Sequence, residues 1–239
     1  MRAAAQPEGR LAMRHVWRDL LFLHWQVDAV RLRRLIPREL DLDLFDGKAY
    51  VGLIPFWMPN IHVASPIAVP IAETVFEVNV RTYVHRKGRE PGVWFFSLDA
   101  SSLPAVVAAR IGYKLPYHWS KMKVDRGERG CVRYCSRRLL SPAVGCRVEY
   151  ERGGVPSPAE PGTLAHFLVE RYILYAGHRG AIYRANVRHE PYPLQNAKLG
   201  SVQENLIAAA GIERPSAEPI VHFVRHVNVD VFALRRAPQ

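Results

Sequence analysis

The chain has 239 residues, of which 49% are hydrophobic and 23% are charged, and its net charge at pH 7 is +11. This apolar content is too high for a chain that stays disordered. No stretch approaches the ~20 consecutive apolar residues of a membrane-spanning helix. The N-terminus turns polar before an apolar run typical of a secretory signal can form. We therefore expect a globular protein of the cytoplasm, with no membrane span.

The excess of basic residues favours anionic partners. Lys and Arg number 33 against 22 Asp and Glu, and such a balance is typical of proteins that bind nucleic acid, acidic lipid or acidic small molecules. The basic residues are nevertheless scattered, and the densest group, at 31–38, contains no aromatic side chain. The pattern therefore disfavours nucleic acid as the partner, although a non-catalytic basic module that binds some other anion stays an alternative.

Cysteine and histidine patterns predict neither disulfides nor a metal site. Cys131, Cys135 and Cys146 are odd in number and lack C-x-x-C spacing, so we expect small buried side chains in a reducing compartment. His222 and His226 would share a face of a helix, but their segment alternates as a strand, where the two rings would lie roughly 13 Å apart. We expect no metal and no cofactor.

The pattern of elements predicts an α+β protein dominated by antiparallel strands. Residues 1–13 resemble a flexible tail, and 14–239 a single domain. Strands are expected at 18–27, 40–45, 48–58, 76–85, 93–100, 117–125, 130–139, 146–151, 172–176, 181–189 and 220–234. Helices are expected at 29–36, 102–113, 163–171 and 201–210.

Three features of the first half bear on the architecture. Asp46-Gly47 is a strong hairpin signal between the strands at 40–45 and 48–58. The second of these strands is apolar on both faces, which predicts that it is covered on both sides. Residues 59–72 contain three prolines among apolar residues and are predicted to form a loop that could cover an apolar site.

The strand at 76–84 carries the strongest signal of a binding site. Glu77, Asn79, Arg81 and Tyr83 alternate with apolar residues and therefore share one face. Glu77 and Arg81 lie too far apart on a strand for a direct ion pair, but both could reach a ligand between them. A solvated face is the plain interpretation. In a closed sheet the same face would line a pocket, where buried charge indicates function.

Blocks of sequence resemble a known family. The blocks are L-F-L-H-W-Q-V-D, D-L-F-D-G-K-A-Y-V-G-L-I-P-F, F-E-V-N-V-R-T-Y-V, V-W-F-F-S-L-D-A and L-P-Y-H-W. They resemble the YqjF-like family of bacterial proteins, which is in turn similar to acetoacetate decarboxylase. This resemblance implies an antiparallel cone-like β-barrel with a few flanking helices and a central cavity. Decarboxylases of that type use a lysine that forms a Schiff base with a keto acid.

The resemblance carries over only in part. Arg18 and Glu77 fall where the decarboxylase has an arginine and an active-site glutamate. The dilysine after a proline is missing, because Tyr117 and His118 follow Pro116. Neither residue can form an imine, so the resemblance implies a cavity without the inherited decarboxylase mechanism.

The leading hypothesis is a protein that binds a small organic carboxylate or carbonyl compound in a barrel cavity. Arg18, Asn79 and Arg81 would bind the ligand, and a catalytic set would move protons: Glu77, Tyr117 and His118, with His118 expected to titrate near neutrality. One alternative is a Schiff-base lyase that uses Lys114 or Lys121 in place of the missing dilysine. A homo-oligomer also stays open.

Overall fold

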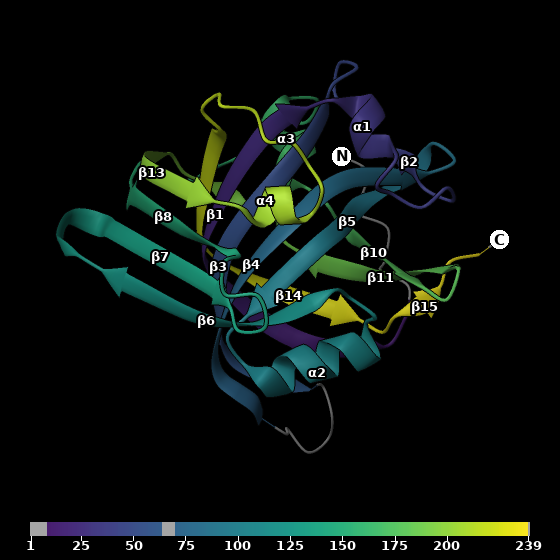
Figure 1. The fold of residues 1–239 in the computed structure, drawn as a ribbon, viewed down its shortest axis with the longest axis horizontal. Coiled ribbons are helices and arrows are strands. Elements are labelled where there is room, and N and C mark those ends of the chain that lie inside the picture. Colours follow the sequence, from purple (N-terminus) through teal and green to yellow (C-terminus); the bar gives the residue numbers. More distant parts are fainter. Residues whose placement is uncertain (1–8, 64–69, 239) are drawn as a thin grey trace.

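The computed structural model describes residues 9–63 and 70–238, and strands make up most of it (Figure 1). The long strands are β1 (Leu11–Val27), β3 (Ala49–Val63), β4 (Pro70–Arg86), β5 (Arg89–Ala100), β6 (Tyr117–Arg126), β7 (Cys131–Arg138), β8 (Gly145–Arg152), β10 (Ile173–His178), β11 (Ala181–His189), β13 (Ala197–Glu204) and β14 (Ile220–Phe232). The short strands are β2 (Asp41–Leu42), β9 (Ser157–Pro158), β12 (Pro193–Leu194) and β15 (Arg235–Arg236).

Helices are few in the described part of the chain. They are α1 (Ala29–Arg33), α2 (Leu103–Gly112), α3 (Leu164–Val169) and α4 (Leu206–Ala209), with one 3₁₀ turn at Glu128–Gly130. The side chains of Asp28, Ser102 and Thr163 cap α1, α2 and α3 by accepting hydrogen bonds from the first helical turn. None of the helices within residues 9–63 and 70–238 is long and apolar enough to cross a membrane. The predicted class, mostly β-sheet with a few helices, is confirmed.

Seven strands of the main sheet pair in a closed cycle. From β5 the pairings run through β10, β11, β14, β1, β3 and β4, and β4 pairs with β5 again. We call this set of strands the ring. An odd number of strands in a cycle cannot all be antiparallel to their neighbours. The one parallel joint in the ring is between β5 and β10, and the other joints are antiparallel.

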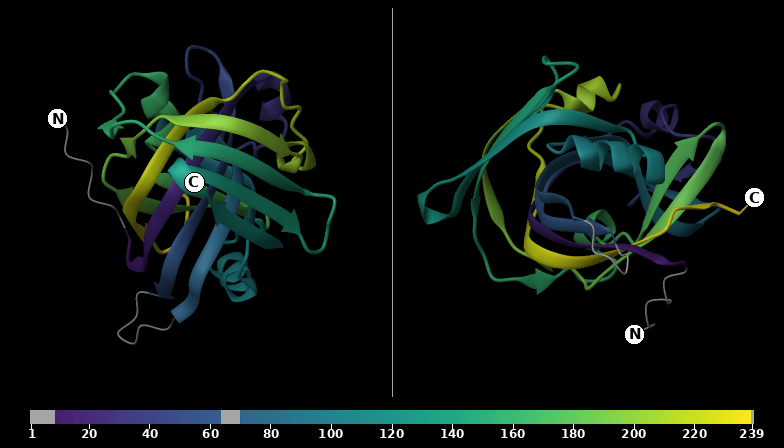
Figure 2. Two further views of the ribbon diagram at one scale, coloured as in Figure 1. Left: turned by 90° about the vertical axis from the view of Figure 1, so that its left-hand side faces the viewer. Right: turned by 90° about the horizontal axis from the view of Figure 1, so that it is seen from below.

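A second group of strands continues from the ring. Strand β6 pairs in parallel with β5, and β7, β8 and β13 follow as antiparallel neighbours. We call β6, β7, β8 and β13 the wing, which curves around one side of the ring (Figure 2, right).

The protein has one core inside the ring and another between the ring and the wing. Leu20, Ile54 and Phe56 belong to the inner core. Leu53, from the same strand as Ile54, packs with Val148 of the wing in the outer core. Strands β1, β3 and β4 are therefore covered on both faces, as predicted for the segment 48–58.

A buried ion pair joins ring to wing. Asp99 of β5 has no exposed surface, and the Arg138 guanidinium of β7 donates to both of its carboxylate oxygens at 2.9–3.1 Å. The Ser120 hydroxyl of β6 donates to the same carboxylate at 2.9 Å. Burial of a charge is tolerated here because the carboxylate has both a countercharge and hydrogen-bond donors.

The predicted hairpin at Asp46-Gly47 forms only as a turn. Asp46 and Gly47 have φ values of 48° and 73°, and Phe45 and Lys48 bridge across them, as in a tight turn of this type. The preceding strand β2, however, pairs with β4, because β3 is already paired on both edges with β1 and β4. The prediction of the turn is right, whereas the predicted pairing is wrong.

Three predicted boundaries are corrected. Residues 11–13, predicted as tail, begin β1 because they pair with β14. Residues 9 and 10 precede the strand, and 1–8 lie outside the described residues. In the predicted loop 59–72, the two ends belong to β3 and β4, and 64–69 lie outside the described residues. The predicted helix 201–210 is strand up to Glu204, because β13 pairs with the edge of β8.

Removal of the Asp99 carboxylate should strongly destabilise the protein. The change Asp99→Ala leaves the Arg138 guanidinium buried without its countercharge, which typically costs about 3–5 kcal/mol. Asp125→Ala is the matched control, because it breaks an exposed pair with Lys123 whose contribution should be below about 1 kcal/mol. Urea denaturation measures both. Equal losses in the two variants would contradict this role of Asp99.

Candidate functional site

The interior of the ring contains a cavity of about 310 Å³. Its wall is predominantly apolar, with side chains from β1, β3 and β5 such as Leu20, Phe56 and Leu98. Helix α2 contributes Ala105 and Ala109 to the same wall. Small apolar residues on this side of the helix let it lie close to the cavity.

Strand β4 points its polar face into this cavity. Glu77, Asn79 and Arg81 all line it, and their exposed fractions are 3%, 4% and 8%. Their neighbours Val78 and Val80 point the other way, into the core beneath the wing. The alternation read from the sequence therefore places a carboxyl, an amide and a guanidinium in one enclosed space rather than in solvent.

The Glu77 carboxyl can gain or lose a proton near neutral pH. The Tyr117 hydroxyl donates to Oε2 of Glu77 at 2.8 Å. Burial raises the pKa of Glu77 from 4.5 to about 7, against hydrogen bonds from Tyr117 and Asn79 that lower it. Burial also raises the pKa of Tyr117 well above 10, so its hydroxyl stays protonated. Such a carboxyl suits general acid–base chemistry.

Arg81 has an incomplete set of partners. Its Nη2 donates to the backbone oxygen of Leu168 at 3.3 Å, and its guanidinium lies 5.5 Å from the ring centre of Phe22 and 5.8 Å from that of Tyr83. Its Nε has no hydrogen-bond partner, and within the described residues no carboxylate pairs with it. A guanidinium remains charged when buried, so the cavity wall contains a positive charge that lacks a counterion.

The Tyr83 ring, which lies beside the Arg81 guanidinium, is held by its own hydrogen bonds. Its hydroxyl donates to the Leu168 backbone oxygen at 2.7 Å and lies 2.6 Å from Nε2 of His24. Burial lowers the pKa of His24 well below 6.5. Tyr83 and His24 do not line the cavity, and because the imidazole is neutral they add no second charge beside Arg81.

Sequence reasoning missed four titratable residues of the wall. His15, Tyr113, Arg171 and Tyr192 line the cavity. Arg171 pairs with Asp43 and lies over the ring of Phe167 at 4.2 Å, so it differs from Arg81 in having a countercharge. The signal for His15 is its two-residue spacing from Trp17 on the strand, which is visible only when β1 is extended toward the N-terminus.

Two predicted site residues do not line the cavity. Arg18 is exposed and lies over the Trp57 ring at 5.7 Å; Trp17 beside it points inward, and Asp19 (φ 50°) interrupts the regular strand. His118 alternates with Tyr117 and therefore faces away from the cavity. Burial and the Arg138 guanidinium lower the pKa of His118 below 6.5.

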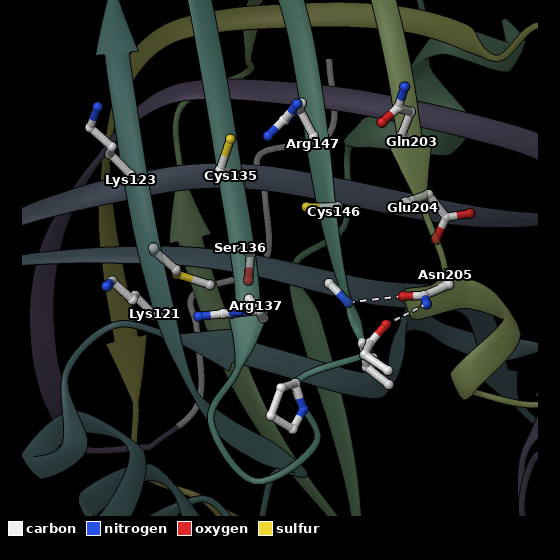
Figure 3. Close-up of a pocket in the computed structure, with 15 residues that line it drawn as sticks. Lys121, Lys123, Cys135, Ser136, Arg137, Cys146, Arg147, Gln203, Glu204 and Asn205 are labelled. Carbon is white, nitrogen blue, oxygen red and sulfur yellow. Dashed lines mark hydrogen bonds between the residues drawn. The ribbon is translucent and has the colours of Figure 1, made fainter.

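The two lysines considered as substitutes for the missing dilysine also lie elsewhere. Lys114 donates to the backbone oxygen of Ile111 at 3.4 Å, and Lys121 is exposed on the outer face of the wing (Figure 3). No lysine is among the described residues that line the cavity with Glu77. The geometry therefore does not support imine chemistry at this site.

The outer face of the wing contains a shallow groove with several basic residues. Lys121, Lys123, Arg137 and Arg147 lie along it (Figure 3). Of these four, Lys123 pairs with Asp125.

The three cysteines are free and differ in exposure. Cys146 is buried, which raises the pKa of its thiol. The prediction that all three are buried is wrong for Cys131, which is exposed on the face of β7 opposite to Val132.

The arrangement of the strands is similar to that of acetoacetate decarboxylase. The enzyme from Legionella pneumophila subsp. pneumophila str. Philadelphia 1 matches 100% of this chain and 92% of its own, with a TM-score of 0.64 and 11% identity. The enduracididine biosynthesis enzyme MppR matches with a TM-score of 0.65 and 13% identity, over 99% of this chain and 97% of its own. An acetoacetate decarboxylase-like enzyme from Sphingomonas wittichii RW1 gives 0.62 and 13%, over 95% and 94%. The protein thus has an acetoacetate decarboxylase-like fold.

Sequence comparison defines the family within that fold. Residues 14–228 match the family model DUF2071, described as an uncharacterized conserved protein. The chain is 36% identical over 230 residues to the uncharacterized protein YqjF of Bacillus subtilis (strain 168), which covers 96% of this chain and 94% of YqjF. The chain therefore belongs to the DUF2071, or YqjF-like, family, as its sequence blocks predicted.

The raised pKa of Glu77 predicts a pH-dependent stability. Below pH 4.5 the carboxyl is protonated in both the folded and the unfolded protein, and its stabilising effect is complete. As pH rises toward 7, the unfolded chain releases the proton first, so stability falls by roughly 3 kcal/mol. Glu77→Gln should remove this fall.

Thermal and urea unfolding at pH 4.5–8 measure the effect. Glu128→Gln, on the exposed turn between β6 and β7, is the control and should leave the wild-type profile unchanged. If Glu77→Gln and wild type lose stability in parallel over this pH range, the elevated pKa of Glu77 is wrong.

Proposed function

We propose that this protein binds a small organic carboxylate, such as an oxo acid, inside the strand ring, which acts as a cone-like β-barrel. The observation that carries the proposal is the buried guanidinium of Arg81, which has no carboxylate partner within the described residues. A buried charge without a counterion is costly. A ligand carboxylate would supply the missing negative charge and complete the hydrogen bonds of Arg81.

The size and wall of the cavity support a small ligand. A volume of about 310 Å³ lies at the lower end of the range for small-molecule sites, which combine apolar walls with a few polar groups. Beside Arg81, Oδ1 of Asn79 has no partner and would accept a hydrogen bond from a ligand hydroxyl or enol. Asn79 and Arg81 are thus the proposed ligand-binding residues.

Glu77 and Tyr117 are the proposed acid–base pair. Because the pKa of Glu77 is about 7, its carboxyl can either give a proton to a bound oxo acid or take one from it. The Tyr117 hydroxyl donates to Oε2 and would stabilise Glu77 when it is ionised. Arg18 and His118 have no part in this proposal, since neither lines the cavity.

Structural relatives support the class of ligand. MppR is described in complex with pyruvate, and also with the condensation product of pyruvate and imidazole 4-carboxaldehyde. Pyruvate is a carboxylate with an adjacent carbonyl group, which matches a cavity that pairs a guanidinium with an acid–base carboxyl. The proposal for this chain assigns no Schiff base, because the cavity wall has no lysine among the described residues.

Replacement of Arg81 should weaken carboxylate binding. Arg81→Met keeps much of the side-chain length but removes the charge, and the lost charged hydrogen bonds should weaken binding about 10- to 100-fold. Isothermal titration of pyruvate, 4-oxopentanoate and hexanoate measures this. Arg18→Met, at an exposed arginine outside the cavity, is the control and should bind as wild type does. Carboxylates that bind Arg81→Met as tightly as wild type, or that fail to bind wild type, would refute the proposal.

A second candidate function is anion binding on the wing. The groove in Figure 3 combines Lys121, Arg137 and Arg147, and within the described residues none of the three pairs with a carboxylate. A flexible polyanion would bind such a face through charge alone, without a shaped pocket.

This second candidate predicts binding that depends steeply on salt. Arg137→Glu combined with Arg147→Glu should weaken binding of a fluorescent polyphosphate or single-stranded oligonucleotide by tenfold or more at low salt, measured by anisotropy. Arg225→Glu combined with Arg188→Glu, at exposed positions outside this groove, is the control for net charge. Equal losses in the two double variants would assign the effect to net charge and exclude the groove.

A further inference from the structure

His15 forms a second polar point in the cavity wall, away from the polar row of β4. It lies on β1, opposite Val229 of β14. The indole Nε1 of Trp17 donates to Nδ1 of His15 at 3.5 Å. Because Nδ1 accepts this hydrogen bond, the proton of a neutral imidazole must be on Nε2. That Nε2 is buried and has no partner.

The His15 ring offers one hydrogen-bond donor without a charge. Burial lowers its pKa from 6.5 to about 4, so the imidazole is neutral at pH 7. A neutral N–H supplies no countercharge for a buried carboxylate, whereas it can fully satisfy an uncharged oxygen such as that of a ketone, an ester or an ether. Arg81 is therefore the better partner for a carboxylate, and His15 is free for a neutral acceptor.

An apolar wall separates the two polar points. Strand β3 lies between β1, which provides His15, and β4, which provides Arg81. The inward side chains of β3 include Ile54, Phe56 and Met58. Trp17 extends this wall by packing on Phe56, with ring centres 5.4 Å apart. The middle of a ligand that reaches both polar points would therefore pack on the apolar side chains of β3.

We infer that His15 determines specificity, and that the ligand carries a carboxylate at one end, an uncharged oxygen acceptor at the other and an apolar segment between them. This inference rests on the proposed function, in which Arg81 binds the carboxylate. It narrows the ligand from any small oxo acid to one whose two oxygen groups are separated by several carbons. Pyruvate, with adjacent groups, would reach only the Arg81 side.

Pairs of acids that differ only in a ketone test this inference. The ligands are 4-oxopentanoate, 5-oxohexanoate, 6-oxoheptanoate and 7-oxooctanoate, each compared with the saturated acid of the same chain length. Isothermal titration at pH 7.5 should show one chain length at which the oxo acid binds wild type about five- to tenfold more tightly, as for one neutral hydrogen bond. The other lengths should show smaller differences.

Variants at His15 assign the preference to its Nε2. His15→Phe keeps an aromatic ring but no donor, and should lose the preference while it still binds saturated acids. His15→Gln offers an amide N–H near the same place and should keep part of the preference. His226→Phe, at an exposed histidine of β14, is the control and should behave as wild type. Circular dichroism confirms that each variant is folded.

The outcomes separate the two proposals. If no chain length favours the oxo acid, or if the preference survives in His15→Phe, the role of His15 is overturned. In that case Arg81-dependent binding of the saturated acids still supports the proposed function. If no acid binds, or if binding does not depend on Arg81, both proposals fail.

Discussion

The pairing of β4 on both of its edges is the constraint on which the site depends. Through β3 on one side and β5 on the other, β4 closes the ring, and the two cores bury both faces of its residues 77–84. Because side chains alternate along the strand, each one points either into the outer core or into the cavity. Glu77, Asn79 and Arg81 are polar residues on the inward face, and burial there is the largest cause of the raised pKa of Glu77.

The ring and wing together explain how a chain without the usual lysine can keep the same architecture. The fold is held by apolar cores on both sides of β1, β3 and β4 and by the Asp99–Arg138 pair. None of these needs the polar residues of the cavity wall. Chemistry on such a scaffold is therefore free to change while the fold persists. In this chain the position after Pro116 carries Tyr117, which serves Glu77 as a hydrogen-bond donor.

Much of the fold, and part of the site, could be predicted from the sequence. The alternation at 76–84 fixed which residues share a face, since the side-chain period of a strand is two. Arg18 and His118 were misplaced for different reasons. In a regular strand Arg18 would share a face with the inward residue Leu20, but the strand is irregular at Asp19, so Trp17 and Leu20 both line the cavity and Arg18 does not. His118 directly follows an inward residue, so it points outward.

Other features depend on contacts between distant segments. The pairing of β2 with β4 could not be predicted from the Asp46-Gly47 motif, because a turn motif indicates only the local backbone geometry and not the partner strand. The strand conformation of 201–204 comes from the edge of β8, and no local propensity reveals such a neighbour. The place of His15 in the cavity wall could not be predicted either, because it depends on the register of β1 against β14, which joins residues about 200 positions apart.

The joint between β1 and β14 also determines when the site can exist. These two strands are among the most widely separated in the sequence, yet they are adjacent strands of the ring. Contacts of such long sequence separation form late, since the entropy of closing a long loop must be overcome first. A polypeptide that is still being synthesised on the ribosome therefore has no closed ring, and no cavity, until β14 emerges. A small molecule that binds in the cavity would therefore bind and stabilise only those protein molecules whose synthesis is complete and whose ring is closed.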